Sequence, residues 1–123
     1  MKKNIVRFLS RLKPIATDIE TKKKLKGKWE EEYGVGANTN LFYNDTYYID
    51  VDEFGAINIS SKTSPNNIYN KIHYYNGELS FEIKIEVYTI PYVLKFNNKT
   101  TNMLEGHSIN RHGVNRMDIW RKI

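Results

Sequence analysis

The sequence predicts an all-β protein, an eight-stranded antiparallel up-and-down barrel preceded by an amphipathic helix. Apolar and polar residues alternate along short segments after Leu25, most clearly over 78–88, as expected for strands with one buried face. Turn residues separate these segments at regular spacing, which is typical of a meander that closes on itself. A chain of 123 residues suits one such domain. We therefore expect a basic helical extension over 1–24 and a barrel over 25–123.

The composition excludes several classes of protein. The chain has no cysteine, so disulfides, thiolate zinc sites and a cysteine nucleophile are ruled out. No segment approaches the roughly 18 apolar residues of a membrane span. The basic N-terminus is not followed by the apolar stretch of a secretory signal. These observations favour a cytoplasmic protein.

The positive charge belongs to the start of the chain. Residues 1–28 contain ten Lys or Arg against Asp18 and Glu20, a balance of +8, whereas residues 29–123 contain nine against twelve acidic residues, a balance of −3. A nucleic-acid-binding domain would carry a basic stripe on its folded body. The distribution therefore argues against a nucleic-acid polymer as partner.

The N-terminal extension has apolar residues at spacings of three and four, which predicts an amphipathic helix. Pro14 predicts a break near Lys13, because proline removes a backbone donor. Thr17 and Glu20 fit a capping box for a second short helix. This extension packs across one end of the barrel, lies on a membrane surface or docks on an acidic protein. Its apolar residues are Ile5, Phe8, Leu9, Leu12, Ile15, Ala16 and Ile19.

Eight strands follow from the alternation, and three turns set the register between them. The expected strands are 26–35, 46–52, 56–61, 68–75, 78–88, 92–96, 103–109 and 114–122. Asn76-Gly77 is typical of a two-residue hairpin, which pairs Tyr74 with Leu79 and turns Ile72, Asn70 and Ile68 inward. Glu53-Phe54-Gly55 suits a three-residue loop, which pairs Val51 with Ile57 and Ile49 with Ile59. His112-Gly113 as a two-residue loop pairs Ser108 with Met117, Gly106 with Ile119 and Leu104 with Arg121.

The first predicted strand begins with Gly27-Lys28-Trp29, which resembles the G-x-W signature of the lipocalins. In that family an arginine late in the last strand packs over the tryptophan, and Arg121 stands at that place. The meander is also similar to the wider calycin group, which includes the fatty-acid-binding proteins. Over residues 25–123 the resemblance implies a ligand-binding barrel with structural roles for Gly27, Trp29 and Arg121. The chain lacks the disulfides and signal peptide of secreted lipocalins, so their carrier function is not implied.

With Trp29 at the closed end of the barrel, strand polarity divides the inward residues into two groups. Those expected at the closed end are Trp29, Val51, Ile57, Tyr74, Leu79, Phe81, Phe96, Leu104, Ile119 and Arg121. Those expected near the mouth are Tyr33, Tyr47, Ser61, Asn70, Val87, Tyr92 and Ser108, with Met117 deeper. Polar groups above an apolar floor are typical of a small-molecule site. The candidate ligand-binding residues are Tyr33, Tyr47, Asn70, Tyr92 and Ser108, unless the tyrosines simply fill the barrel.

No catalytic or metal site is predicted, and no cofactor. His73 faces outward and His112 lies in a turn, whereas His107 is expected to pair with Asp118 on the outer surface, without a nucleophile nearby. Among Glu30, Glu31 and Glu32, alternation turns only Glu31 inward. A desolvated Glu31 could act as an acid; pairing with a cation, or a place at a bulge, is the simpler interpretation.

The first functional hypothesis is a non-enzymatic lipocalin-like β-barrel that binds a small, partly apolar molecule entering at the tyrosine-lined mouth. The alternative is a protein-interaction module with a filled barrel, such as a bacterial or phage regulator, immunity protein or inhibitor. In that case the basic extension binds an acidic protein or a membrane surface. A third hypothesis, a sensor of a nucleotide second messenger, requires cations at the mouth, where the sequence places none.

Overall fold

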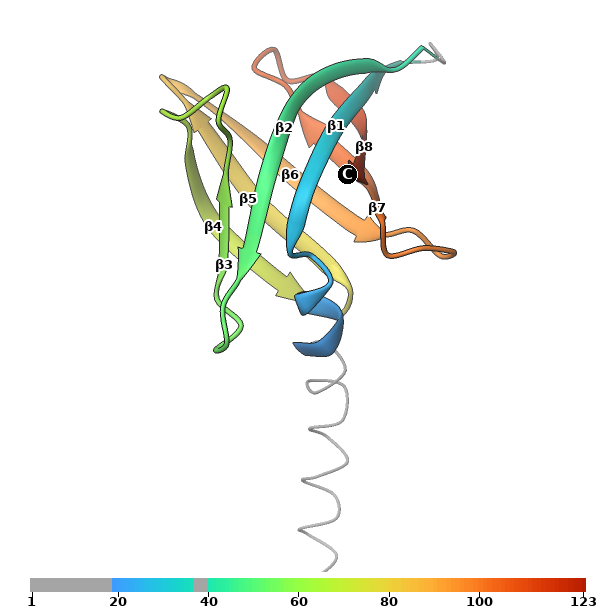
Figure 1. Ribbon diagram of the computed structural model, residues 1–123. Helices are drawn as coiled ribbons and strands as arrows, with labels where there is room; N and C mark the ends of the chain where they lie inside the picture. The colour runs from blue at the N-terminus through green and yellow to red at the C-terminus, as the bar shows by residue number, and fades with distance from the viewer. Residues whose placement is uncertain (1–18, 37–39) are drawn as a thin grey trace, which may run out of the picture.

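The computed structural model describes residues 19–36 and 40–123. It contains eight strands: β1 (Gly27–Val35), β2 (Phe42–Val51), β3 (Ile57–Ser60), β4 (Ile68–Tyr75), β5 (Glu78–Ile85), β6 (Tyr88–Phe96), β7 (Met103–Ile109) and β8 (Asn115–Lys122). They form one antiparallel sheet in the order β3-β2-β1-β8-β7-β6-β5-β4. The sheet curls into a nearly closed barrel with β3 and β4 at its edges (Figure 1). The predicted all-β barrel of eight antiparallel strands is therefore confirmed.

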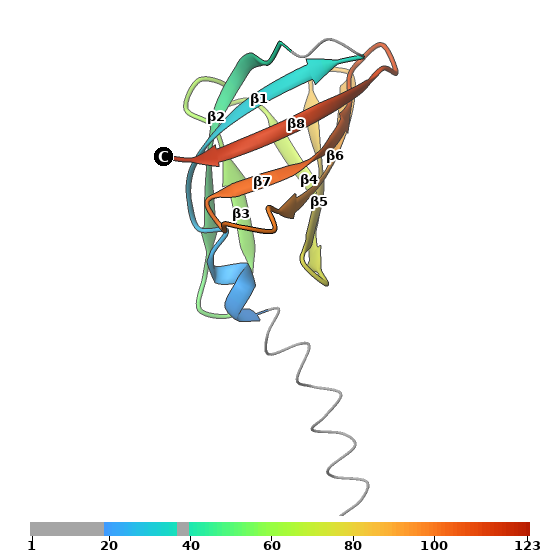
Figure 2. The same cartoon turned by 90° about the vertical axis from the view of Figure 1, so that its right-hand side faces the viewer.

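The two ends of the barrel differ. A short helix over residues 19–23 lies against one end, which we call the closed end (Figures 1 and 2). The opposite end, where β1 finishes and β2 begins, is called the open end. Most of the predicted amphipathic helix falls within 1–18, outside the described residues. In the part of the chain that the structure describes, no helix has the length and apolar character needed to span a bilayer.

Two predicted strands have different bounds because a turn interrupts the alternation. Glu86-Val87 forms a two-residue turn in which Glu86 takes a φ of 55° and Ile85 pairs with Tyr88. β6 therefore begins at Tyr88 rather than Tyr92, and Val87 is 84% exposed instead of facing into the mouth. Neither residue is a usual turn former, so the alternation of apolar residues ran through the turn. Independently of any turn, β2 begins at Phe42, four residues before its predicted start.

The Asn76-Gly77 and Glu53-Phe54-Gly55 turns are confirmed. Tyr74 pairs with Leu79, and Val51 pairs with Ile57.

The inward prediction for Asn70 and Ile68 is wrong. The β4–β5 register shifts between Asn70 and His73, where Lys71 takes a φ of 54°. A bulge of this kind exchanges the two faces of a strand. Tyr69 consequently packs against the core, while Ile68 and Asn70 are exposed.

The register of the last hairpin is shifted by one residue from the prediction. The loop contains three residues, Arg111-His112-Gly113, with Gly113 at a φ of 76°, and Ile109 pairs with Asn115. Since side chains alternate along a strand, a shift of one residue reverses every side chain of β8. The residues predicted to face inward, Met117, Ile119 and Arg121, lie on the outer face, and Arg116, Asp118 and Trp120 are buried.

Trp29 lies in the core at the closed end, as predicted, but its cover is a different residue. Its Nε1 donates a hydrogen bond to the Leu25 carbonyl at 2.7 Å. The Lys122 ammonium lies 5.0 Å from the Trp29 ring and donates to the Lys24 carbonyl at 2.6 Å. Arg121 lies on the outer face and pairs with Glu32 at 2.9 Å. The prediction that Arg121 covers Trp29 is therefore wrong.

The backbones of β6 and β7 approach each other closely at Gly106. A Cβ atom added at Gly106 would lie 1.8 Å from the backbone oxygen of Val93, far inside contact distance. Only glycine permits this approach, because any side chain would push the two strands apart.

We expect the Gly106→Ala variant to lose about 3 kcal/mol or more of its free energy of unfolding, because the added methyl group meets backbone rather than a movable side chain. Gly77→Ala is the matched control. Its Cβ atom would meet nothing within 4 Å, so only the left-handed backbone costs about 1–2 kcal/mol. Urea unfolding of both variants measures the difference, and equal losses would contradict the close approach of β6 and β7.

Candidate functional site

A belt of six polar side chains crosses the barrel below its open end. All six are buried, and they come from β1, β2, β6, β7 and β8. We call the set Glu31, Tyr47, Tyr92, Ser108, Arg116 and Asp118 the polar belt.

Glu31 is the centre of the polar belt. Its carboxylate accepts hydrogen bonds from the Tyr47 hydroxyl at 3.0 Å, the Tyr92 hydroxyl at 2.8 Å and the Asn44 amide at 2.6 Å. The Arg116 guanidinium lies 3.7 Å from the same carboxylate. The β1–β2 register shifts directly after Glu31. The predictions that Glu31 points inward, pairs with a cation and lies at a bulge are confirmed.

Arg116 joins the two halves of the belt. Its Nη2 donates to the Tyr92 hydroxyl and its Nε to the Ser108 hydroxyl, both at 2.9 Å. Ser108 in turn donates to Asp118. The guanidinium also lies 4.8 Å from the ring of half-buried Tyr33. Burial opposes the charge of Arg116, but Tyr92, Asp118 and Glu31 together raise its pKa above the ordinary value.

Asp118 is buried beside Glu31 in the polar belt. Its Oδ2 accepts from Ser108, whereas its Oδ1 is buried without a hydrogen-bond partner among the described residues. Burial, followed by the neighbouring Glu31, raises the pKa of Asp118 to about 8, against the opposing effects of Ser108 and Arg116. We therefore expect the two acids of the belt to share one proton at neutral pH.

Burial also raises the pKa values of the two belt phenols, with Glu31 adding to the effect on both. Tyr47 and Tyr92 consequently remain protonated and act as donors to Glu31.

Aromatic rings fill the interior beside the polar belt. Trp120 stacks on Tyr47 with ring centroids 4.4 Å apart, and Phe81 stacks on Tyr92 at 4.9 Å. Phe81 meets Trp120 edge-on at 5.7 Å. Tyr47 and Tyr92 thus pack on core residues through their rings and on the belt through their hydroxyl groups.

The structure brings four of the five candidate ligand-binding residues together and leaves the fifth apart. Tyr47, Tyr92 and Ser108 come together in the polar belt, and Tyr33 lies beside it over Arg116. Asn70 is exposed on β4 and does not join them. The sequence predicted no cation at the mouth, but Arg116 points inward there. Its guanidinium forms an ion pair with Glu31.

Ser61, also predicted at the mouth, is buried in a separate cluster. Its hydroxyl donates to Asp45 at 3.0 Å, and so does the Ser64 hydroxyl. Thr63 bonds the same carboxylate. This cluster holds the start of the β3–β4 connection against β2, so these hydroxyl groups are engaged within the fold.

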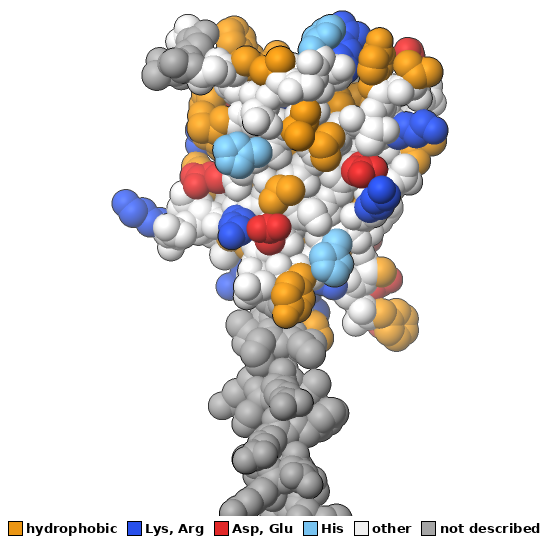
Figure 3. All heavy atoms as spheres, turned by 180° about the vertical axis from the view of Figure 1, so that it is seen from behind, with side chains coloured by type: hydrophobic (Ala, Val, Ile, Leu, Met, Phe, Trp, Pro, Cys, Tyr) orange, Lys and Arg blue, Asp and Glu red, His pale blue; other side chains and the backbone are white. Residues whose placement is uncertain are grey.

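A ring of exposed apolar side chains surrounds the open end. It is formed by strand ends and turns, and Val87 is its most exposed member. Figure 3 shows hydrophobic side chains gathered at the end of the molecule away from the short helix. We call this ring the apolar rim; among the described residues it comprises nine side chains, Val35, Phe42, Tyr43, Ile68, Ile85, Val87, Tyr88, Ile109 and Val114.

A hollow of about 490 Å³ lies outside the barrel wall, over β6, β7 and β8, with Phe96, Glu105, His107 and Met117 among its lining. The predicted pairing of His107 with Asp118 is wrong, because His107 pairs with Met117 and Asp118 is buried inside. His73 is exposed, as predicted. Within 19–36 and 40–123, no group of three or more His, Asp or Glu side chains is arranged to hold a metal ion.

Arg116 and Asp118 are the belt residues that sequence reasoning missed. A signal for them exists in the loop before β8. The Asn110 side chain accepts from the backbone N–H groups of His112 and Val114 at 2.9 and 3.0 Å. Asp52 does the same with Phe54 and Ala56 at 2.9 and 2.8 Å. The shared pattern, Asp or Asn followed three residues later by Gly, marks a three-residue loop in both hairpins and sets the register of β8.

Compared with known proteins, the chain matches no family model, no curated protein and no solved structure. The lipocalin resemblance therefore stays a prediction.

The shared proton makes stability depend on pH. The folded protein holds the Asp118 proton more tightly than the unfolded chain does, so the free energy of unfolding falls as pH rises from about 4 to about 8. In Asp118→Asn the side chain is neutral at every pH, and its amide oxygen can still accept from Ser108. We expect this variant to exceed the wild type by about 1 kcal/mol or more above pH 8, the free energy of one pKa unit.

Denaturant unfolding between about pH 5 and pH 9 measures this difference. Asp50→Asn is the control, because Asp50 is exposed and only pairs with Lys26 at 3.5 Å; its pH profile should follow that of the wild type. An Asp118→Asn variant that is less stable at every pH would show that Asp118 is charged in the folded protein.

Proposed function

We propose that the protein is a non-enzymatic binding module that uses the apolar rim to bind a partner protein. The rim itself carries this proposal. Single exposed apolar residues are normal on a protein surface, but a contiguous group of them marks an interaction site. Here aliphatic and aromatic side chains from the four connections at the open end, among them Phe42, Val87 and Val114, are exposed at one end of the barrel.

The interior supports a binding role over a catalytic one. The acidic and phenolic groups of the polar belt are buried and bond mainly to one another. Stacked rings of Tyr47, Trp120, Phe81 and Tyr92 fill the space beside them. A buried hydrogen-bonded network of this kind fixes side-chain positions, and it stiffens the barrel that carries the rim.

A small, partly apolar ligand at the mouth is the second candidate, and the surroundings of Tyr33 favour it. Half-buried Tyr33 packs on Arg116 below and lies 5.9 Å from Phe42 of the rim. Exposed Asn44 stands nearby on the polar belt, bonded to Glu31. A ligand between the rim side chains would meet apolar walls and polar groups beneath, the arrangement usual for small-molecule sites.

Site-specific photo-crosslinking in the full chain tests the proposal. p-Benzoylphenylalanine is placed at position 87 of the rim or at position 54 of the closed end, where Val87 and Phe54 are 84% and 87% exposed. Matched exposure at opposite ends makes position 54 the control. We expect irradiation in cells to yield a discrete protein adduct from position 87 and none of that size from position 54.

Adducts of the same size from both positions, or from position 54 alone, would contradict a partner at the rim. A small molecule retained by the purified full chain in native mass spectrometry, without a protein adduct from position 87, would favour the second candidate.

A further inference from the structure

The hollow in the outer wall over β6, β7 and β8 has the size of a small-molecule site. Its volume of about 490 Å³ falls within the roughly 300–1,000 Å³ that is usual for such sites. The strand register decides which outward side chains meet there: Lys95 lies opposite Glu105, and His107 lies opposite Met117. These residues do not belong to the apolar rim, so the hollow is a separate surface.

The β8 side of the hollow is apolar. Met117 is 47% exposed, and Ile119, two residues further along the same face of the strand, is half-buried. Phe96 at the end of β6 is half-buried as well. A ligand that covers these side chains removes apolar surface from water, which favours binding.

The β6–β7 side of the hollow carries two opposite charges that do not pair with each other. Lys95 and Glu105 lie directly opposite on neighbouring strands, a position at which opposite charges can interact favourably. Instead, Lys95 pairs with Glu78 on its other side at 3.6 Å, and Glu105 accepts from the Asn97 amide at 2.7 Å. The hollow therefore presents an ammonium group and a carboxylate side by side.

Both charged groups can still contact a ligand. The Lys95 and Glu78 side chains are 66% and 42% exposed, and an ion pair between exposed side chains contributes little to stability. The hydrogen bond from Asn97 uses only the Oε1 atom of Glu105, which is exposed. His107 lies on the same strand as Glu105, and its neutral imidazole supplies one donor and one acceptor.

This arrangement of charges selects the charge of the ligand. An anion at Lys95 would also meet Glu105, and a cation at Glu105 would also meet Lys95, whereas a zwitterion is complementary to both. We propose that the hollow binds a small zwitterion with an apolar side chain, the chemistry of an apolar amino acid. The ligand carboxylate contacts Lys95 and its ammonium contacts Glu105, while its side chain covers Met117 and Ile119. Because the hollow is separate from the rim, this inference goes beyond the proposed function and does not depend on it.

Titration of the ¹⁵N-labelled full chain with L-phenylalanine, 3-phenylpropionate and 2-phenylethylamine, followed by amide chemical shifts, tests the inference. L-Phenylalanine has both charges, whereas 3-phenylpropionate lacks the ammonium and 2-phenylethylamine lacks the carboxylate. We expect L-phenylalanine to shift the amide signals of Gly106, His107 and Ile119 with a dissociation constant of about 1 mM. Each of the other two probes should bind at least about threefold more weakly.

Two variants separate the two charges. Lys95→Gln should weaken the binding of L-phenylalanine and 3-phenylpropionate about threefold, because both lose a contact between opposite charges, and should not weaken that of 2-phenylethylamine. Glu105→Gln should weaken L-phenylalanine and 2-phenylethylamine by a similar factor and should not weaken 3-phenylpropionate.

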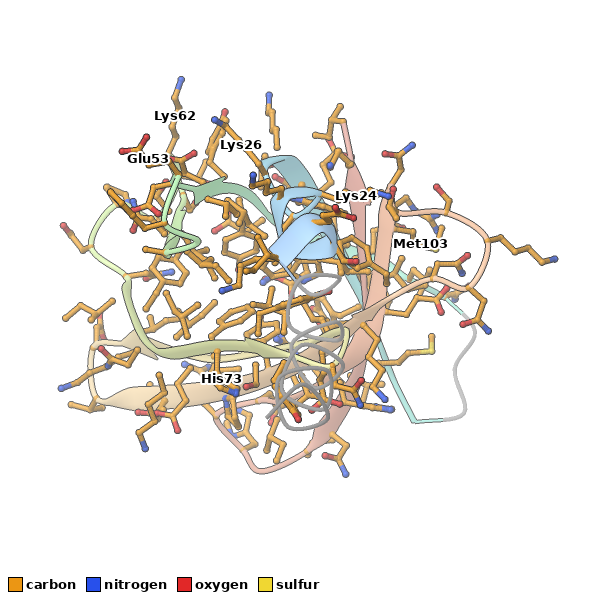
Figure 4. The ribbon with its side chains drawn as sticks, turned by 90° about the horizontal axis from the view of Figure 1, so that it is seen from below. Lys24, Lys26, Glu53, Lys62, His73 and Met103 are labelled. Carbon is orange, nitrogen blue, oxygen red and sulfur yellow. The ribbon has the colours of Figure 1, made fainter. Side chains whose placement is uncertain are left out.

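Lys71→Gln is the matched control. Lys71 is exposed and pairs with Glu82 at 3.4 Å, much as Lys95 pairs with its own acidic partner. It belongs to β4, and Figure 4 shows His73 of that strand on a different side of the barrel from Met103 at the start of β7. Lys71→Gln should therefore bind all of the probes as the wild type does.

Equal affinity for the three probes would overturn the inference, because the paired charges would then play no part. An absence of shifts at about ten times the expected dissociation constant, or shifts confined to signals of the rim, would also overturn it. So would the same loss in Lys71→Gln as in Lys95→Gln. The comparison of probes uses the wild-type chain, so it decides the matter even if a variant fails to fold, and the crosslinking result at the rim is unaffected.

Discussion

The burial of two carboxyl groups, Glu31 and Asp118, beside the single guanidinium of Arg116 is the constraint on which the rest of this barrel depends. Charges taken out of water must be paired and hydrogen-bonded, or the fold is strongly destabilised. Ionising both acids beside a single guanidinium costs free energy, because two like charges would be buried close together. We therefore expect one proton to be retained. The Arg116 guanidinium lies 3.7 Å from the Glu31 carboxylate and balances the remaining negative charge of the belt.

This constraint decides where several other residues lie. The phenols of Tyr47 and Tyr92 turn inward because Glu31 needs donors, and their rings then stack on Trp120 and Phe81. Ser108 lies between Arg116 and Asp118 for the same reason. The belt also ties β1 to β6, β7 and β8 through side chains, in addition to the ladders between neighbouring strands. Tyrosines that looked like a ligand-binding mouth are thus held by the fold itself.

The sequence predicted the strands well and the last register badly, for a physical reason. Period-two alternation and turn residues are local signals, and they identified β4 and β7 to the residue. The bulge at Lys71 leaves no local signal in the alternation. The register of the last hairpin depends on whether its loop has two or three residues. With three residues the register shifts by one, so that Arg116 and not Met117 points into the barrel. The inward position of Glu31 was predicted from alternation alone, but its partners could not be.

The barrel separates two surfaces of different chemistry. The open end exposes an apolar ring, and the closed end carries the lysines that lead from the basic N-terminal segment. Trp29 and Lys122 seal the core at the closed end, and the polar belt lies below the open end. The side chains of the polar belt are buried between these two ends and are not displayed on either of them.

The most direct test of the shared proton is the carboxyl carbon chemical shift of Asp118, followed by ¹³C NMR as a function of pH. A protonated Asp118 near neutral pH, with a titration midpoint of about 8, is the predicted result. A midpoint near 4, the ordinary value for aspartate, would contradict the shared proton and with it the arrangement of the belt.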